Sequence, residues 1–201
     1  MNKLLKIFPV LIFVFLVGSA IGIKAQTEGL SDKIVRFHIV ADSNEEEAQE
    51  VKWEIRKAIF DNINLENISS KEDALLYFNS QKENIEKIAD EILKNNKLSY
   101  SANVYIGKKQ FPVREYNSFV LPAGIYDTVS VNLGSGKGKN FFCVMYPSLC
   151  MINSITEKTA ECPEMLGSVL TDKETQLVTD TSEKTVVKFK IAEMLDKFMS
   201  N

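Results

Sequence analysis

The sequence contains little of what most catalytic and metal-binding sites require. It has one histidine, His38, and three cysteines, Cys143, Cys150 and Cys162, among 201 residues. One histidine cannot form a two-histidine metal site, and the cysteines lack the paired C-x-x-C spacing that is typical of structural zinc sites. We therefore expect no metal site.

An excess of charge of one sign is also absent. The chain has 24 lysine and arginine residues against 27 aspartate and glutamate residues, a net charge of -3. That balance lacks the basic footprint of a nucleic-acid-binding protein, so we expect no nucleic-acid partner. Low-complexity tracts are missing too, and the length suits one domain with a hydrophobic core.

A long apolar run lies at the N-terminus. Lys3 and Lys6 precede the apolar run at 7–23, and Ala25 is a small residue in a plausible cleavage position. This is the pattern of a secretory signal peptide. The run is also near the ~17 to 25 residues that cross a bilayer, so an uncleaved membrane anchor is the alternative. We expect 1–25 to be one of the two, and the rest of the chain to be exported.

The remaining pattern predicts an α+β fold. A strand is expected at 33–40, and helices at 44–62 and 70–95, where serines precede acidic residues at the spacing of a capping box. Each helix has a single apolar stripe, which has to be covered by a sheet or by the other helix. We predict a mostly antiparallel sheet with two main helices packed on it. The core domain is expected at 33–152, followed by a variable C-terminal extension at 153–201 that ends in a helix at 183–199.

Two β-hairpins are expected in the second half. The first joins a strand at 101–107 to one at 111–116 through Gly107 and two lysines. The second, the predicted core hairpin, pairs a strand at 125–133 with one at 141–146 across the loop at 134–140. Its first strand is expected to have a buried face and a solvent-exposed face that carries Tyr126. The loop does not fit the P-loop pattern, so we interpret it as a flexible basic tip and expect no nucleotide cofactor.

Three features leave alternatives open. The spacing of Cys143 and Cys150 permits a disulfide in an exported protein, but does not decide the pairing. A catalytic Cys143 with His38 as base is less favoured, because Cys143 lies in an apolar strand where thiols are inert. Trp53 and Phe60 are either a second packing surface against the next helix or an exposed aromatic patch for a partner.

Several blocks, in order, resemble the stage II sporulation protein R family of endospore-forming bacteria. They are IVRFHIVADSNEEEAQEVKWEIRKAI, FPVREY and PAGIYDTVSVNLGSGKGKNFFCVMYPSLC, between Ile34 and Met151. The sequence departs from the family pattern at Phe141 and Phe142, where the family usually has two tryptophans, and at Ser148, where a second proline is common. The first two changes keep large aromatic side chains.

The resemblance implies an intercellular signal in endospore formation. Such a protein is exported from the forespore into the space between forespore and mother cell. There it is required to activate a membrane-embedded aspartic protease that processes the precursor of a mother-cell sigma factor. On this interpretation the chain is not an enzyme, and it contacts the membrane only through its N-terminal segment. The alternatives are an exported cysteine-dependent hydrolase and a cell-wall-binding module.

A ligand of this kind needs a contact surface rather than a catalytic centre. We expect that surface on the exposed face and the tip of the core hairpin, with Trp53 and Phe60 as second choice. The predicted contact residues are Arg114, Tyr116, Tyr126, Lys137, Lys139, Asn140 and Phe142.

Overall fold

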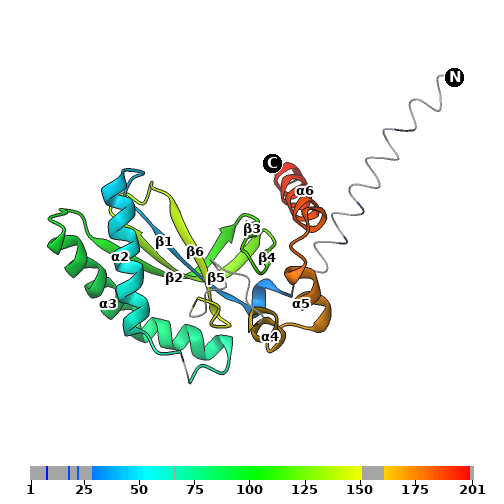
Figure 1. Cartoon of the computed structure of the whole chain (residues 1–201), viewed down its shortest axis with the longest axis horizontal. Helices are drawn as coiled ribbons and strands as arrows, with labels where there is room; N and C mark the ends of the chain where they lie inside the picture. Colours follow the sequence, from blue (N-terminus) through cyan, green and yellow to red (C-terminus); the bar gives the residue numbers. More distant parts are fainter. Residues whose placement is uncertain are drawn as a thin grey trace.

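The computed structural model describes residues 29–65, 67–150 and 161–199, together with the isolated positions 8, 18 and 22. Apart from those isolated positions, the predicted signal peptide or anchor at 1–25 lies outside the described residues. Figure 1 traces the elements along the chain. They are η1 (Ser31–Lys33), β1 (Val35–Val40), α2 (Glu46–Asn62), α3 (Lys71–Asn95), β2 (Ala102–Phe111), β3 (Arg114–Glu115), β4 (Val120–Leu121), β5 (Gly124–Leu133), β6 (Asn140–Tyr146), α4 (Glu161–Gly167), α5 (Asp172–Thr179) and α6 (Glu183–Met199).

A four-stranded sheet in the order β2-β5-β1-β6 forms the centre of the fold. β1 runs parallel to β5 and antiparallel to β6, and β2 runs antiparallel to β5. The short strands β3 and β4 form a separate antiparallel pair. The α+β class with a mostly antiparallel sheet is therefore confirmed.

The predicted core hairpin is wrong. Its two strands are present as β5 and β6, but β1 lies between them and pairs with both. All six residues of β1 are buried. Burial on both faces is typical of a strand in the middle of a sheet, and the position of β1 excludes direct pairing of β5 with β6.

The other predicted hairpin is also wrong. β2 continues through Gly107 without a turn and pairs with β5 from Ala102 to Phe111. The side chain of Tyr105 occupies the space where a Cβ of residue 107 would lie. A Cβ at Gly107 would meet the Tyr105 hydroxyl at 2.6 Å. Gly107 therefore makes space for the side chain of Tyr105 within a continuous strand, and it does not form a turn.

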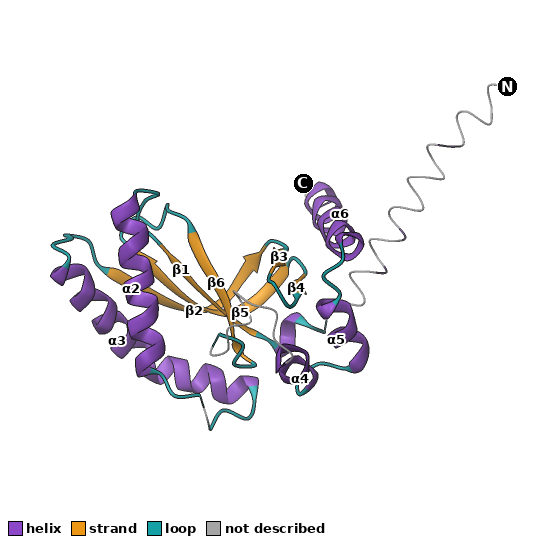
Figure 2. Ribbon diagram, in the orientation of Figure 1, coloured by secondary structure: helices purple, strands orange, loops and turns teal. Residues whose placement is uncertain are grey.

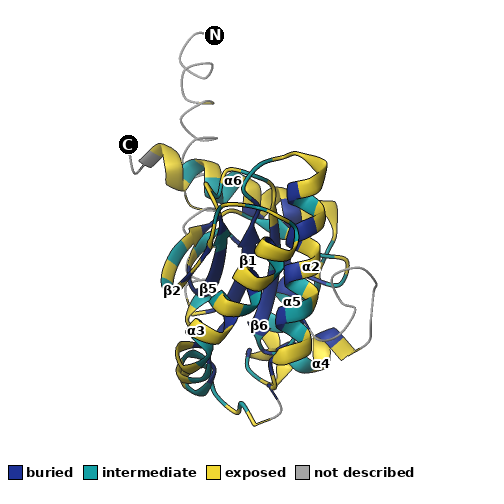
Figure 3. Ribbon diagram, turned by 90° about the vertical axis from the view of Figure 1, so that its left-hand side faces the viewer, coloured by how far each residue is buried: buried dark blue, intermediate teal, exposed yellow. Residues whose placement is uncertain are grey.

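The helices α2 and α3 cover one face of the sheet, as predicted (Figure 2). Figure 3 looks onto this helical layer, where the exposed residues lie on the outer side and the strands behind are mostly buried. The cap of α3 is Ser70 and not Ser69, whose spacing to Glu72 predicted a capping box. The Ser70 hydroxyl accepts a hydrogen bond from the Asp73 amide at 3.0 Å. Ser43 does not cap α2, whose N-cap is Glu45. The fully buried core of this layer includes Val35, Phe37, Ile39, Ile55, Ile59, Phe78, Ile85, Ala89, Val129, Val131, Cys143 and Met145.

A second, smaller layer covers part of the opposite face of the sheet. Figure 1 shows the β3-β4 pair and the three C-terminal helices on that side. Tyr126 is only 1% exposed, so the predicted solvent-exposed face of β5 is wrong. The reason is that the segment after residue 160, which has a polar sequence, forms α4 and α5 and supplies buried apolar residues. This second core contains Leu30, Ile34, Phe111, Phe119, Leu121, Tyr126, Val144, Leu149, Cys162, Leu166, Leu170 and Val178.

The helix expected at 183–199 is present as α6. Val186 and Phe189 are buried with Val120 of β4, so this helix is docked on the body of the protein. The predicted boundary between the core domain and the extension, at 152/153, lies in 151–160, outside the described residues.

Candidate functional site

The predicted contact residues fall on two separate parts of the molecule. One group is exposed in the loop between β5 and β6, and the other lies around a buried arginine on the face opposite α2 and α3. The groups therefore do not form one continuous surface. The first is Lys137, Lys139 and Asn140, and the second is Arg114, Tyr116, Tyr126 and Phe142.

The loop at 134–140 is held in place by the segment that follows β1. The Gly138 amide donates to the Ala41 carbonyl at 2.8 Å. The Ser135 amide donates to Asp42 Oδ1 at 2.6 Å, and the Ser135 hydroxyl donates to the Asp42 carbonyl at 2.8 Å. A Cβ on Gly138 would overlap the Ser43 carbonyl. The loop is therefore not the tip of a hairpin, because it crosses the end of the intervening strand β1 and is hydrogen-bonded to the segment that follows that strand.

The loop adjoins an aromatic cluster where α2 meets the edge strand β6. The ring centroids of Trp53 and Phe141 lie 5.2 Å apart in an edge-to-face arrangement. The Arg56 guanidinium carbon lies 4.6 Å from the ring centroid of Phe60 and 4.7 Å from that of Phe141. Lys52 and Lys139 join this cluster to the loop. We define the basic aromatic patch as Lys52, Trp53, Arg56, Phe60, Lys139 and Phe141.

Trp53 and Phe60 differ in exposure within this patch. Phe60 packs on Phe37, with ring centroids 5.4 Å apart, and so belongs to the core. Trp53 is 50% exposed. Both rings contact Phe141 of β6, and Phe60 also contacts Phe37 of β1, so their aromatic contacts are with the sheet and not with the next helix as expected. An exposed aromatic group is left at Trp53.

The cations of the patch have few polar partners. Lys52 is buried, and its ammonium donates to Gln49 Oε1 at 2.6 Å and to the Lys139 carbonyl at 3.2 Å. Burial lowers the pKa of Lys52, and the charge of Lys139 lowers it further. Burial also lowers the pKa of Arg56, whose Nε lacks a hydrogen-bond partner among the described residues. Added negative charge here would stabilise both cations.

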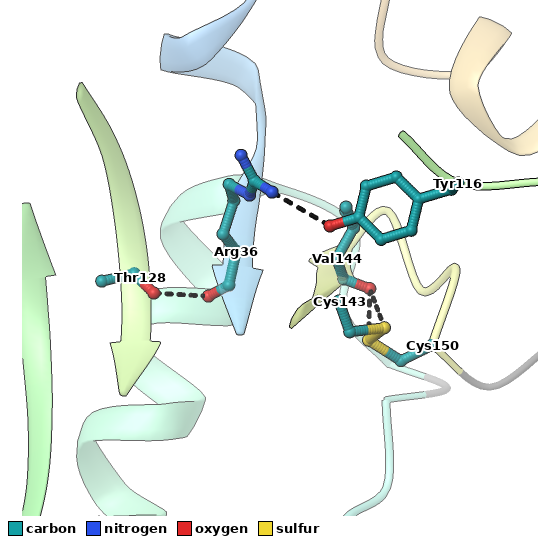
Figure 4. The surroundings of a disulfide bond; sticks show 6 residues. All are labelled: Arg36, Tyr116, Thr128, Cys143, Val144 and Cys150. Carbon is teal, nitrogen blue, oxygen red and sulfur yellow. Dashed lines mark hydrogen bonds between the residues drawn. A yellow bond between two sulfur atoms is a disulfide. The ribbon is translucent and has the colours of Figure 1, made fainter. Parts of the chain in front are cut away.

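The second group surrounds Arg36, which projects from β1 on the face opposite α2 and α3. Figure 4 shows its guanidinium directed toward Tyr116, and Nη2 donates to the Tyr116 hydroxyl at 2.9 Å. The guanidinium carbon lies 4.3 Å from the ring centroid of Phe111 and 5.0 Å from that of Tyr126. Cation–π contacts of this kind offset part of the cost of burying the charge.

His38 lies two residues further along β1 on the same face. Its ring stacks on Phe142, with centroids 5.7 Å apart, and Phe111 meets it edge-on at 5.4 Å. Arg114 covers the ring of Phe142, with its guanidinium carbon 4.0 Å from the centroid. Burial, reinforced by the charges of Lys109 and Arg36, lowers the pKa of His38 to about 3. The imidazole is therefore neutral at neutral pH.

The cysteine–histidine pair of the hydrolase hypothesis is not assembled. Cys143 is disulfide-bonded to Cys150, so it offers no thiolate (Figure 4). Cys143 also lies in the core under α2 and α3, whereas His38 is on the other face of the sheet. Cys162 is a buried free cysteine, and burial raises the pKa of its thiol to about 11.

Within the described part of the chain, no group of three or more histidine, cysteine, aspartate or glutamate side chains could hold a metal ion. In the same residues, no helix has both the length and the apolar character needed to span a bilayer.

Arg36, Lys52, Arg56 and Lys109 were not predicted as site residues. On a strand, Arg36 shares a face with His38, and this period of two is a signal that could have paired them. The other three residues could not be found from sequence, because their contacts form only through tertiary packing. Lys52 meets Lys139, Arg56 meets Phe141, and Lys109 meets Ser130.

Comparisons with known proteins agree with the sequence resemblance. The family model described as "Stage II sporulation protein R (spore_II_R)" matches residues 31–156. The curated "Stage II sporulation protein R" of Bacillus subtilis (strain 168) is 32% identical over 158 residues, which cover 73% of this chain and 70% of that protein. No solved structure matches the chain. The chain therefore belongs to the stage II sporulation protein R family, and its role lies in sporulation.

Proposed function

We propose that this protein is an exported signal that activates the membrane-embedded aspartic protease that processes the mother-cell sigma factor precursor. Family membership supports the sporulation role, and the resemblance implies the protease as partner. On this proposal the chain crosses the forespore membrane, acts in the intermembrane space, and works by binding rather than by catalysis.

One observation carries the choice of docking surface: Trp53 is half exposed beside cations that lack carboxylate partners among the described residues. Tryptophan and arginine are enriched among the residues that contribute most to protein interfaces. The exposed lysines Lys137 and Lys139 extend the positive charge along the loop. This arrangement fits a partner surface that carries carboxylates around an apolar pocket.

Binding can activate a protease only if the ligand prefers the active state. A ligand shifts a conformational equilibrium by its differential affinity for the two states. We therefore expect the basic aromatic patch and the adjoining lysines to contact a surface that is complete only in the active, dimeric protease. Carboxylates on that surface would supply the negatively charged partners that Arg56 and Lys52 lack among the described residues.

Co-expression in a non-sporulating host tests this proposal. The exported part of the chain is produced together with the protease and its sigma precursor, and precursor cleavage is scored. The double variant Lys137→Glu, Lys139→Glu should abolish cleavage, because it reverses charge at the docking surface. The matched control, Lys173→Glu with Lys184→Glu, changes two exposed lysines in α5 and α6 and should leave cleavage intact.

A second pair of variants tests the aromatic part of the surface. Trp53→Ala should reduce cleavage strongly, whereas Leu76→Ala, at a residue that is 70% exposed on α3, should not. Circular dichroism and melting curves establish that each variant is folded. Normal cleavage with both the charge reversal and Trp53→Ala would refute the docking surface, and cleavage that never depends on this chain would refute the proposed function.

A further inference from the structure

A buried cluster on the face opposite α2 and α3 has positive charge but no compensating acid. Arg36 is 0% exposed and His38 is 7% exposed. Lys109 reaches the same face, where its ammonium donates to the Ser130 hydroxyl at 2.8 Å, and Ser130 is the register neighbour of His38. We call Arg36, His38, Lys109 and Ser130 the Arg36–His38 cluster.

The hydrogen-bonding capacity of this cluster is largely unused. Nε and Nη1 of Arg36, and both ring nitrogens of His38, are buried without a hydrogen-bond partner among the described residues. The rings of Phe111 and Tyr126 face the guanidinium and lower the electrostatic cost of its charge. They do not accept its in-plane N–H groups, and leaving a buried donor unsatisfied is unfavourable.

No carboxylate neutralises the cluster within the described part of the chain. The described ion pairs of β5 and of the segment preceding β1 join Asp127 to Lys71, Asp32 to Lys108 and Glu174 to Lys33. None of them includes Arg36 or Lys109. Buried arginine is normally paired, since its planar fork matches the two oxygens of a carboxylate or phosphate group. The cluster thus contains unpaired N–H donors of Arg36, and the described residues supply no carboxylate that could accept hydrogen bonds from them.

We propose that the Arg36–His38 cluster is a binding site for a small oxyanion that presents a carboxylate or phosphate group. One oxygen accepts hydrogen bonds from Arg36, and the negative charge is shared with Lys109. The aromatic side chains of Phe111 and Phe142 pack around it and shield it from bulk water, which strengthens the ionic contacts. This site is separate from the docking surface of the proposed function and does not depend on it.

His38 provides a direct probe of the site, because it is the only histidine in the chain. Its imidazole gives a single set of carbon-bound proton resonances, which can be followed by NMR in the purified exported protein. Sodium acetate and sodium phosphate are titrated separately at constant ionic strength, with sodium chloride as the reference salt. The two oxyanion arms distinguish a carboxylate ligand from a phosphate ligand.

The expected result is a saturable shift of the His38 resonances with acetate or phosphate at millimolar concentration, and none with chloride. Arg36→Met should abolish the shift, and Lys109→Met should weaken binding at least about tenfold, the loss expected for one hydrogen bond to a charged group. Lys108→Met is the matched control. Lys108 is the neighbour of Lys109 on β2, and its side chain is 61% exposed. The Lys108→Met variant should bind the oxyanion as tightly as the unmodified protein does.

Other outcomes overturn the proposal. No saturable shift with either oxyanion, or an equal shift with chloride, rules out an oxyanion site. A shift that persists unchanged in Lys109→Met shows that the anion binds elsewhere. If Arg36→Met does not fold, as judged by circular dichroism, the half-buried Lys109 carries the test, because removing its ammonium leaves the core residues in place.

Discussion

The ammonium of Lys71 and the carboxylate of Asp127 lie 2.6 Å apart and join the first turn of α3 to β5. Both side chains are mostly buried, with 14% and 12% exposed. Lys71 also donates to the Asp32 carbonyl at 2.7 Å. The pair explains the acidic residue that interrupts the apolar row of β5, and it ties the helical layer to the sheet.

Removing one partner of this pair should be more damaging than removing both. Asp127→Ala is expected to lower the free energy of unfolding by about 3 kcal/mol, because it leaves the Lys71 charge buried and unpaired. Adding Lys71→Met should recover part of that loss. Urea denaturation of the two single variants and the double variant measures the coupling. Lys87→Ala is the control, since its pair with Glu91 is exposed and should contribute less than about 1 kcal/mol. Additive effects at Lys71 and Asp127 would contradict the expectation.

Stability should fall in mild acid because of His38. Its folded-state pKa is lowered to about 3 from the ordinary value of 6.5, so between these values only the unfolded state binds the proton. The contribution of His38 is fully present above pH 6.5 and is lost as the pH falls toward about 3, by at most ~1.4 kcal/mol per pH unit. Urea denaturation of the protein and of His38→Asn across this range measures it. The variant should show a shallower pH dependence, and identical slopes would refute the expectation.

Reduction of the disulfide between Cys143 and Cys150 should destabilise the protein. In the loop-entropy estimate, a bridge between cysteines seven residues apart contributes about 2.5 kcal/mol. Melting curves with and without a reductant measure the effect. The variant Cys162→Ala should keep the full effect of the reductant, because Cys162 is free. A protein whose melting ignores the reductant would contradict the disulfide.

The close approach of the loop at 134–140 to the segment after β1 should make Gly138 intolerant of substitution. Gly138→Ala is expected to destabilise the protein by more than about 1 kcal/mol, since a Cβ would displace the Ser43 carbonyl and with it the start of α2. Gly167→Ala, where the nearest atom is 4.0 Å from the added Cβ, should be neutral or slightly stabilising. Thermal unfolding of both variants makes the comparison, and equal melting temperatures would show that the loop is not held as described.

The helices α2, α3 and α6 and most individual strands could be predicted from the sequence, whereas α4 and α5 could not. The apolar stripes of α2 and α3 and the period of two in β5 are local patterns, and α6 has the bounds that its pattern predicts. The family could be recognised as well, because its blocks are contiguous stretches of residues in order. These features depend on neighbours along the chain, which the sequence shows directly.

The pairing of the strands and the composition of the sites were decided only by the tertiary structure. β1 is separated from β5 and β6 by two helices in sequence, yet it inserts between them, and no local pattern states which strand fills that place. The same insertion brings Arg36 and His38 beside Lys109 and Phe142, and it fixes the loop next to Trp53. Burial of Tyr126 on the second face of β5 depends on α4 and α5, which come from the far end of the chain. Such long-range contacts form because they bury apolar surface. The free energy gained depends on how all the elements pack together, so it cannot be assigned from the sequence of one segment.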